Sequence, residues 1–281
     1  MKTLIQKIPL DHQECFACRT YTTPNFETNW HKHEEYELIL ITQGNGTVMI
    51  GDYVNEYRKG DVYFLASNLP HWFRKSNQKI TGSAIVIHFT KEIFGTGLIN
   101  TPELIKINRL LSQQNGLLFQ KKLKQLITED IKKINECKGF DRLLLLLSCI
   151  QHIACGNEVD IIANDFSDTK NNVNQTIEGI IEYTFKHFKN PITLNEIANI
   201  AKMTIPTFCR FFKRNIKKSY FDFLQEVRIS HACKLLYSTN KSVMGICYDS
   251  GYNSWSHFSK QFKVVKKMTP TAYRKKYGSE I

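Results

Sequence analysis

Three histidines and one glutamate in the first 71 residues could bind a metal ion or a small molecule: His31, His33, Glu37 and His71. Imidazole nitrogens with a carboxylate suit a borderline divalent cation such as zinc, nickel, manganese or iron. The same groups could instead hydrogen-bond an organic effector, for which stacking faces are available on Trp30, Tyr36 and Trp72. A third alternative is a set of partly exposed polar residues at the mouth of a barrel. The residue types leave these alternatives open.

The spacing of the first three ligands is more specific than their types. His31, His33 and Glu37, followed after six residues by Gly44, resemble the first motif of the cupin family, HxHx3Ex6G. The resemblance implies an antiparallel barrel in which these side chains and His71 face inward from neighbouring strands.

The second cupin motif is matched less well. Gly60-Asp61 and Pro70-His71 fall where it lies, but Ala66-Ser67-Asn68 replaces its P-x-G turn, and Lys75 stands near its usual asparagine. These departures favour an organic ligand over a metal ion, and the metal set His31, His33, Glu37 and His71 remains the alternative.

The last third of the chain carries residues suited to a polyanion. Residues 171–281 contain 18 lysines and arginines and 7 acidic residues, whereas residues 1–170 contain 20 and 19. Nearly all of the net charge of +12 therefore lies in one segment. A field concentrated in this way favours binding to phosphates with release of their counterions.

An internal repeat gives that charge a structural setting. Phe208, Arg210, Phe212 and Lys213 recur 50 residues later as Phe258, Lys260, Phe262 and Lys263. Upstream, Thr193, Ile197 and Ala198 recur 49 residues later as Ser242, Ile246 and Cys247. Each copy has the pattern of a helix-turn-helix, with a capped short helix, a turn and a second helix whose phenylalanines face inward. The second helices then present outward the residues predicted to contact DNA: Pro206, Thr207, Cys209, Arg210, Lys213, Ser254, Trp255, Ser256, His257, Ser259, Lys260 and Lys263.

The elements that position these residues can be read from periodicity. Short β-rich runs at 36–42, 47–50, 62–65 and 83–89 predict an antiparallel barrel. Helical patterns follow from Thr101, over 120–136 and over 141–155, the last unusually apolar and therefore suited to pack on the barrel or on a second subunit. A long helix over 220–237 separates the two repeats and would hold their second helices at a fixed separation, about 34 Å for successive major grooves.

Residues from about 173 to 277 resemble the AraC/XylS family of bacterial regulators. The resemblance rests on the repeat, on Arg228 and the Ala232…Leu235-Leu236 segment, and on Gly251-Tyr252…Phe258-Ser259…Phe262-Lys263 followed by Thr269-Pro270 and Tyr273-Arg274. It implies one chain with two DNA-reading units under the control of a variable N-terminal domain. By analogy with sensor domains of this family, a saccharide is the favoured effector. Pro206 and Cys209 depart from the larger polar side chains of many members, and Lys217-Lys218-Ser219 replaces a usual glycine.

The sequence therefore predicts an α+β chain of two domains. We expect a cupin-like barrel over 1–100, a helical extension for homodimerisation over 101–156, a linker over 157–172 and a double helix-turn-helix domain over 173–281. The predicted function is sequence-specific transcription regulation, as an activator, with double-stranded DNA, a small-molecule effector and RNA polymerase as partners. Because no signal peptide or 20-residue apolar span is present, a cytoplasmic location and no membrane partner are expected. A metal-dependent cupin enzyme, an isomerase or dioxygenase with a basic appendage, is the alternative from another class.

Overall fold

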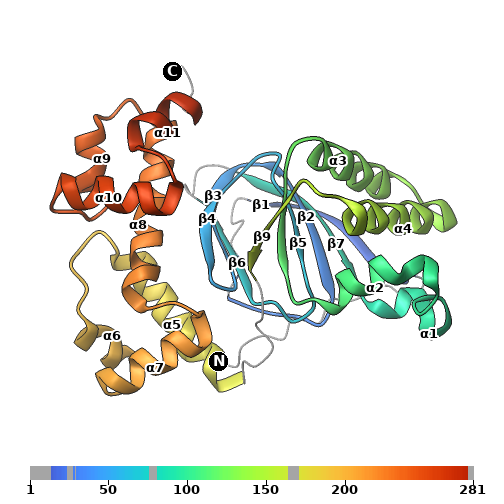
Figure 1. Ribbon diagram of the computed structural model, residues 1–281, viewed down its shortest axis with the longest axis horizontal. Helices are drawn as coiled ribbons and strands as arrows, with labels where there is room; N and C mark the ends of the chain where they lie inside the picture. Colours follow the sequence, from blue (N-terminus) through green and yellow to red (C-terminus); the bar gives the residue numbers. More distant parts are fainter. Residues whose placement is uncertain (1–13, 24–27, 29, 76–80, 164–170, 278–281) are drawn as a thin grey trace. The chain divides into compact units, whose positions relative to one another are not determined.

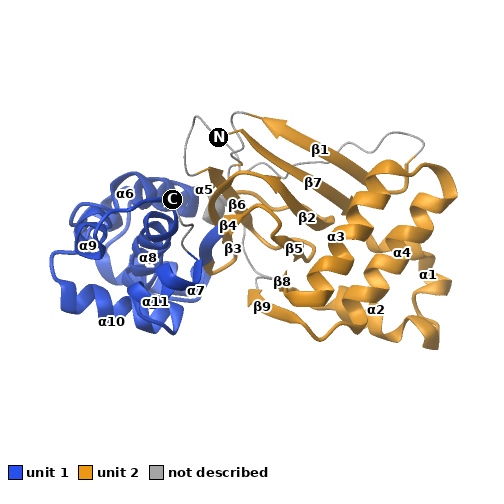
Figure 2. Cartoon of the chain, turned by 90° about the horizontal axis from the view of Figure 1, so that it is seen from above, with its two compact units in different colours: residues 1–2, 54–56, 169–281 blue, residues 3–53, 57–168 orange. Residues whose placement is uncertain are grey.

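The computed structural model describes residues 14–23, 28, 30–75, 81–163 and 171–277, with side chains from 176 onward in the last range. The chain divides into two compact units: residues 3–53 and 57–168 form the N-terminal unit, and residues 1–2, 54–56 and 169–281 form the C-terminal unit (Figure 2). No helix in these ranges is both long enough and apolar enough to cross a bilayer.

The N-terminal unit is built on two antiparallel sheets. One has six strands in the order β1-β7-β2-β5-β8-β9, and the other has three in the order β4-β3-β6 (Figure 1). The strands are β1 (Ala17–Thr23), β2 (Tyr36–Gln43), β3 (Asn45–Ile50), β4 (Tyr53–Arg58), β5 (Val62–Leu65), β6 (His71–Lys75), β7 (Gly82–Phe89), β8 (Gly116–Phe119) and β9 (Val159–Ala163).

Alternation along each strand divides the apolar side chains between two cores. Ile39 and Ile41 of β2 pack with Val48 and Phe73 of the smaller sheet, so one core lies between the sheets. Leu38, on the opposite face of β2, packs with the helices that cover the larger sheet. These helices, drawn in green to yellow-green in Figure 1, are α2 (Ile105–Ser112), α3 (Lys121–Glu136) and α4 (Gly139–Cys155), whereas the short α1 (Gly95–Leu98) is exposed.

The domain boundaries expected from the sequence need correction. Strand β8 lies inside the range 101–156 expected to be helical, and it pairs with β5 of the larger sheet. Strand β9 lies inside the expected linker 157–172 and pairs with β8 through residues 159–163. The sheet therefore extends further along the chain than the pattern indicated. The apolar run of β8 is four residues long, which is too short for periodicity to distinguish a strand from part of a helix.

In the C-terminal unit, residues 171–277 form helices joined by short loops. Its helices are α5 (Asn171–His187), α6 (Leu194–Ile200), α7 (Ile205–Ile216), α8 (Tyr220–Ser238), α9 (Val243–Asp249), α10 (Trp255–Lys266) and α11 (Pro270–Tyr277). The predicted inward phenylalanines, Phe208, Phe212, Phe258 and Phe262, are all fully buried. The long helix expected over 220–237 is α8.

The repeat extends to the backbone conformation. Thr193 caps α6 in a capping box with Glu196, and Ser242 accepts a hydrogen bond from the Gly245 N–H at the start of α9. Lys217 ends α7 and Lys267 ends α10, both in the left-handed region with φ of 60° and 56°. Each helix-turn-helix unit is therefore two helices, a left-handed residue and a following helix, which is α8 in the first and α11 in the second. The two units share α8 as a packing partner, because its C-terminal half also lies in the core of the second.

Candidate functional site

The predicted ligands of the N-terminal unit converge around one buried carboxylate. Glu37 of β2 is 7% exposed and lies on the strand face that points between the two sheets. His71 opens β6, and its backbone forms a two-hydrogen-bond bridge with His31. His33 lies 3.3 Å from Glu37, measured from Nε2 to Oε2, and His71 lies 2.9 Å from the same oxygen. All four predicted residues are buried.

A fourth histidine, which sequence reasoning missed, completes the cluster. His88 of β7 places Nε2 3.2 Å from Glu37 Oε1, and its Nδ1 is buried without a hydrogen-bond partner in the described part of the chain. The two residues are direct partners in the β2–β7 register. No motif singles out His88, because its place depends on which strand pairs with β2.

The hydrogen bonds of two histidines fix which ring nitrogen faces the carboxylate. Nδ1 of His33 lies 3.0 Å from the Glu35 carbonyl oxygen, and Nδ1 of His71 lies 2.9 Å from that of Leu69. Since a carbonyl oxygen can only accept, each Nδ1 carries a proton and donates it. Both Nε2 atoms then face Glu37, where either a second proton or a metal ion is needed between nitrogen and carboxylate. Metal-binding histidines are oriented by the same kind of carbonyl contact.

The electrostatics of the cluster favour an ionised carboxylate. Burial by itself raises the pKa of Glu37, but the adjacent His71 and His88 and the hydrogen bonds from His33 and His71 outweigh it, so the pKa lies well below its usual value. Burial lowers the pKa of His33, but its hydrogen bond and attraction to Glu37 outweigh burial and raise it.

The donor set fits a divalent transition metal. The ligand atoms of His31, His33 and His71 lie within 4.8 Å of one another, as do those of His33, Glu37 and His88. These imidazoles and one carboxylate match the preferences of zinc, nickel or iron.

The three aromatic residues predicted to line an effector site are not all near the cluster. Tyr36 points the opposite way from Glu37, stacks between Phe64 and Phe89, and donates a hydrogen bond to the Leu111 carbonyl. Trp72 follows His71 on β6 and therefore lies on the other strand face. Both are corrections that strand alternation could have supplied. Trp30 is buried, and its Nε1 has no hydrogen-bond partner among the described residues.

The second candidate site is the exposed face of α7 and α10. Arg210 and Lys213 of α7 are exposed, as are Lys260 and Lys263 of α10. The other predicted residues that are exposed are Pro206, Thr207, Cys209, Ser254, Ser256 and His257, and Ser259 is half-buried. Trp255 is also half-buried, because its ring packs on the core beside Phe258. Arg214, four residues after Arg210, adds an exposed cation that the repeat did not single out.

Both parts of the chain match known domain families. Residues 16–132 match the model of the AraC-like ligand binding domain, and residues 197–276 match a helix-turn-helix domain model. The two matches together span more than half of the chain.

The chain is also similar to known proteins along most of its length. The chain is 23% identical to the HTH-type transcriptional activator RhaS of Mannheimia succiniciproducens, covering 87% of this chain and 88% of that protein. It is 22% identical to the lactose operon transcription activator of Staphylococcus xylosus, covering 89% and 88%. Among solved structures, ToxT of Vibrio cholerae is 14% identical, covers 95% of this chain and 99% of that chain, and has a TM-score of 0.38. The chain belongs to the AraC family of DNA-binding transcription regulators, with an AraC-like ligand-binding domain followed by a helix-turn-helix domain.

Proposed function

We propose that this regulator is controlled by a divalent transition-metal ion held in the N-terminal unit. The observation that supports it is the convergence of buried imidazoles on Glu37, with the rings of His33 and His71 turned by backbone carbonyls. His31, His33, His71 and Glu37 would hold the ion, and His88 would hold the other carboxylate oxygen. The ion would supply positive charge where the cluster otherwise needs extra protons, and so would stabilise this packing of β2, β6 and β7.

A metal titration of DNA binding tests the proposal. Protein purified without a histidine tag is dialysed against a chelator, and its affinity for a promoter fragment is measured with added zinc, nickel, manganese or iron(II). We expect one metal equivalent per chain and a change in DNA affinity that saturates at that stoichiometry, because a ligand shifts a conformational equilibrium by its differential affinity. The proposal would be refuted if the protein binds none of the four ions and its DNA affinity is the same with and without each of them.

An organic effector is the second candidate, and the names of relatives favour a saccharide. One relative is the lactose operon activator, and another is the melibiose operon regulatory protein of Escherichia coli, 21% identical over 264 residues. Lactose and melibiose are therefore the first compounds to test by thermal shift, since a ligand that binds only the native state raises its melting temperature. A saccharide that stabilises metal-free protein would favour this candidate.

We propose that α7 and α10 read the DNA sequence with the twelve predicted residues, of which Arg210 and Lys260 occupy equivalent outward positions. Long cations at such positions reach guanine edges or phosphates in the major groove.

Activation, with RNA polymerase as a partner, is the proposed direction of regulation, because two relatives are named activators. A reporter gene behind a promoter fragment that the protein binds distinguishes activation from repression. A protein with this task acts in the cytoplasm.

We further propose that α4 forms a homodimer contact. Phe140 is 70% exposed and Leu144, one turn later, is 47% exposed, although Leu146, Ile150 and Ile153 of the same helix are buried in the core. Light scattering at tens of micromolar should give a dimer mass, and Leu144→Glu should give a monomer with an unchanged circular dichroism spectrum. A wild-type monomer would contradict the proposal.

A catalytic role is not proposed. Relatives along most of the chain are named as transcription regulators, and a double helix-turn-helix has no task in isomerase or dioxygenase chemistry. Turnover of isomerase or dioxygenase substrates by the metal-loaded protein would reverse this.

A further inference from the structure

The two helix-turn-helix units meet at a junction built around Arg228 of α8. Its Nε donates to the Phe188 carbonyl oxygen at 2.8 Å, and its Nη2 donates to the Asn190 carbonyl oxygen at 2.9 Å. Both carbonyls lie in the segment after α5, which leads into the first unit. Hydrogen bonds from a charged donor are about twice as strong as neutral ones, so Arg228 holds this segment firmly against the shared helix.

The turn of the second helix-turn-helix unit packs against the same arginine. Gly251 has φ of +83°, and a Cβ added there would lie 2.6 Å from the Phe188 carbonyl oxygen and 3.0 Å from Arg228 Nε. The next residue, Tyr252, has its ring 5.8 Å from the guanidinium and donates a hydrogen bond to Gln225 Oε1 at 2.6 Å. Arg228 thus contacts the first unit, the shared helix and the second unit's turn.

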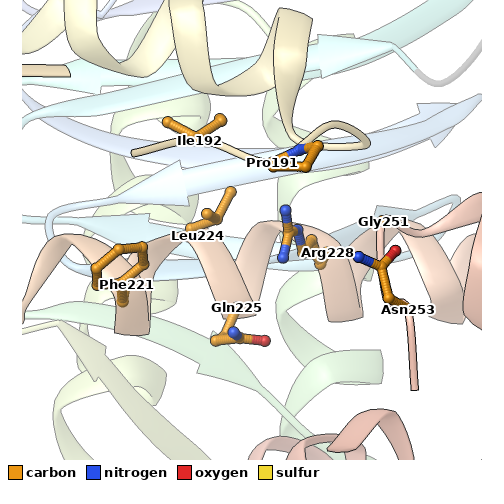
Figure 3. Close-up of a pocket in the computed structure, with 8 residues that line it drawn as sticks. All are labelled: Pro191, Ile192, Phe221, Leu224, Gln225, Arg228, Gly251 and Asn253. Atoms are coloured by element: carbon orange, nitrogen blue, oxygen red, sulfur yellow. The ribbon is translucent and has the colours of Figure 1, made fainter. Parts of the chain in front are cut away.

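The space beside this contact is open. A pocket of about 210 Å³ adjoins Arg228 (Figure 3), lined by Pro191, Ile192, Phe221, Leu224, Gln225, Gly251 and Asn253. Because side chains do not fill this space, packing on that side cannot replace the hydrogen bonds of Arg228 if they are lost.

Arg274 of α11 makes an analogous pair of contacts within the second unit alone. Its Nε donates to the Leu236 carbonyl oxygen at 3.3 Å, and its Nη2 donates to that of Lys241 at 2.6 Å. These carbonyls lie at the end of α8 and in the loop before α9. The chain therefore offers a matched arginine that anchors one unit without touching the other unit's loop.

We propose that Arg228 and Gly251 are positioning residues that set the separation of α7 and α10, and so determine which spacing between two DNA half-sites the protein accepts. This rests on the proposal that both helices read DNA. A mutation at the junction should change the tolerance of the protein for half-site spacing while each helix still recognises its own half-site.

The test uses the full chain and an operator that it selects from a random duplex library. Derivatives carry one, two or five extra base pairs between the half-sites, or one scrambled half-site. Wild type should bind best at the selected spacing. Arg228→Gln should lose about tenfold in affinity there, the equivalent of one charge-assisted hydrogen bond, with half-site affinities within about twofold of wild type. The preference of Arg228→Gln for the selected operator over the lengthened ones should be smaller than that of wild type. Gly251→Ala should show the same two changes.

Arg274→Gln is the control. It should weaken binding to the half-site read by α10 and leave the preferred spacing sharp. Two outcomes would overturn the positioning role of Arg228 and leave DNA reading by both helices standing. In one, Arg228→Gln has the same preference for half-site spacing as wild type. In the other, it loses affinity for both half-sites together with its helical circular dichroism signal. A wild-type protein that selects no two-part operator would overturn DNA reading by both helices, and with it this proposal.

Discussion

At the scale of single residues, the proposed metal site depends on Glu37, because its carboxylate contacts three histidines from different strands and loops. His33→Ala should abolish stoichiometric metal binding, since it removes a ligand whose ring is already oriented. His88→Ala should weaken metal affinity about 10–100-fold, the usual cost of losing a group that orients a ligand. Elemental analysis and competition with a chelator measure both effects.

His152→Ala is the matched control for these variants. His152 pairs with Asp130 at 2.8 Å between α4 and α3, outside the cluster. The His152→Ala variant should keep the metal content of wild type. Equal metal loss in all three variants would indicate general unfolding and would contradict the assigned site.

The four clustered ligands show what spacing can and cannot predict. His31, His33 and Glu37 lie within seven residues, so their motif is local, and His71 was found through a second motif. His88 lies 51 positions after Glu37 and reaches it only because β7 pairs with β2 in a particular register. The position of Tyr36 was predictable, since neighbours on a strand face opposite ways.

A half-buried histidine in the C-terminal unit gives a pH prediction. Burial, reinforced by Lys189 and Lys234, lowers the pKa of His231 to about 4, and its Nε2 has no hydrogen-bond partner within the described residues. The unfolded chain takes up the proton near pH 6.5, so it binds more protons than the folded chain between pH 6.5 and 4. The free energy of unfolding should therefore fall as pH decreases through this window, by up to about 3 kcal/mol.

His231→Phe should flatten this dependence, because Phe keeps the contact with the Phe188 ring and cannot titrate. Urea unfolding followed by circular dichroism at pH 7, 6, 5 and 4 measures it. A variant with the same slope as wild type between pH 6 and 4 would assign the effect to other groups.

At the scale of elements, the repeat was the most informative sequence signal. Caps, inward phenylalanines and outward cations were predicted at both copies, because each is a local property of a short helix. The left-handed Lys217 and Lys267 were not predicted, since glycine is the usual residue for that conformation. Strands β8 and β9 were also missed, because their pairing partners lie far away in the sequence.

The equivalent positions of Arg210 and Lys260 lead to a prediction about DNA reading. Replacing either with Ala should cost roughly 1–3 kcal/mol of specific binding and relax selectivity at one base position. Lys275 is an exposed cation on α11, and Lys275→Ala serves as the control. Its loss of binding free energy should be smaller and should be the same for all DNA sequences. Binding assays on single-base operator variants separate these outcomes, and an equal loss on every sequence would make Arg210 and Lys260 phosphate contacts.

At the scale of the whole molecule, the two units have separate cores and very different charge. The apolar core of the second helix-turn-helix unit is built from residues between Ile229 and Tyr273, all inside the C-terminal unit. The net charge of +11 over residues 171–281 lies there as well. Domain order was predictable from composition, whereas the boundary was not, because β9 continues the sheet into the expected linker.

This separation predicts that residues 171–281 fold alone and bind the selected operator. The fragment keeps both repeats, the shared helix α8 and its caps, so its helical circular dichroism per residue should match that expected from α5 to α11. Its DNA affinity should fall steeply with salt, because each phosphate contact releases a counterion. Filter binding between about 50 and 200 mM salt measures the slope. Residues 1–160, nearly neutral, are the control, and a fragment that binds no better than they do at about 100 mM salt would show that DNA binding requires the N-terminal unit.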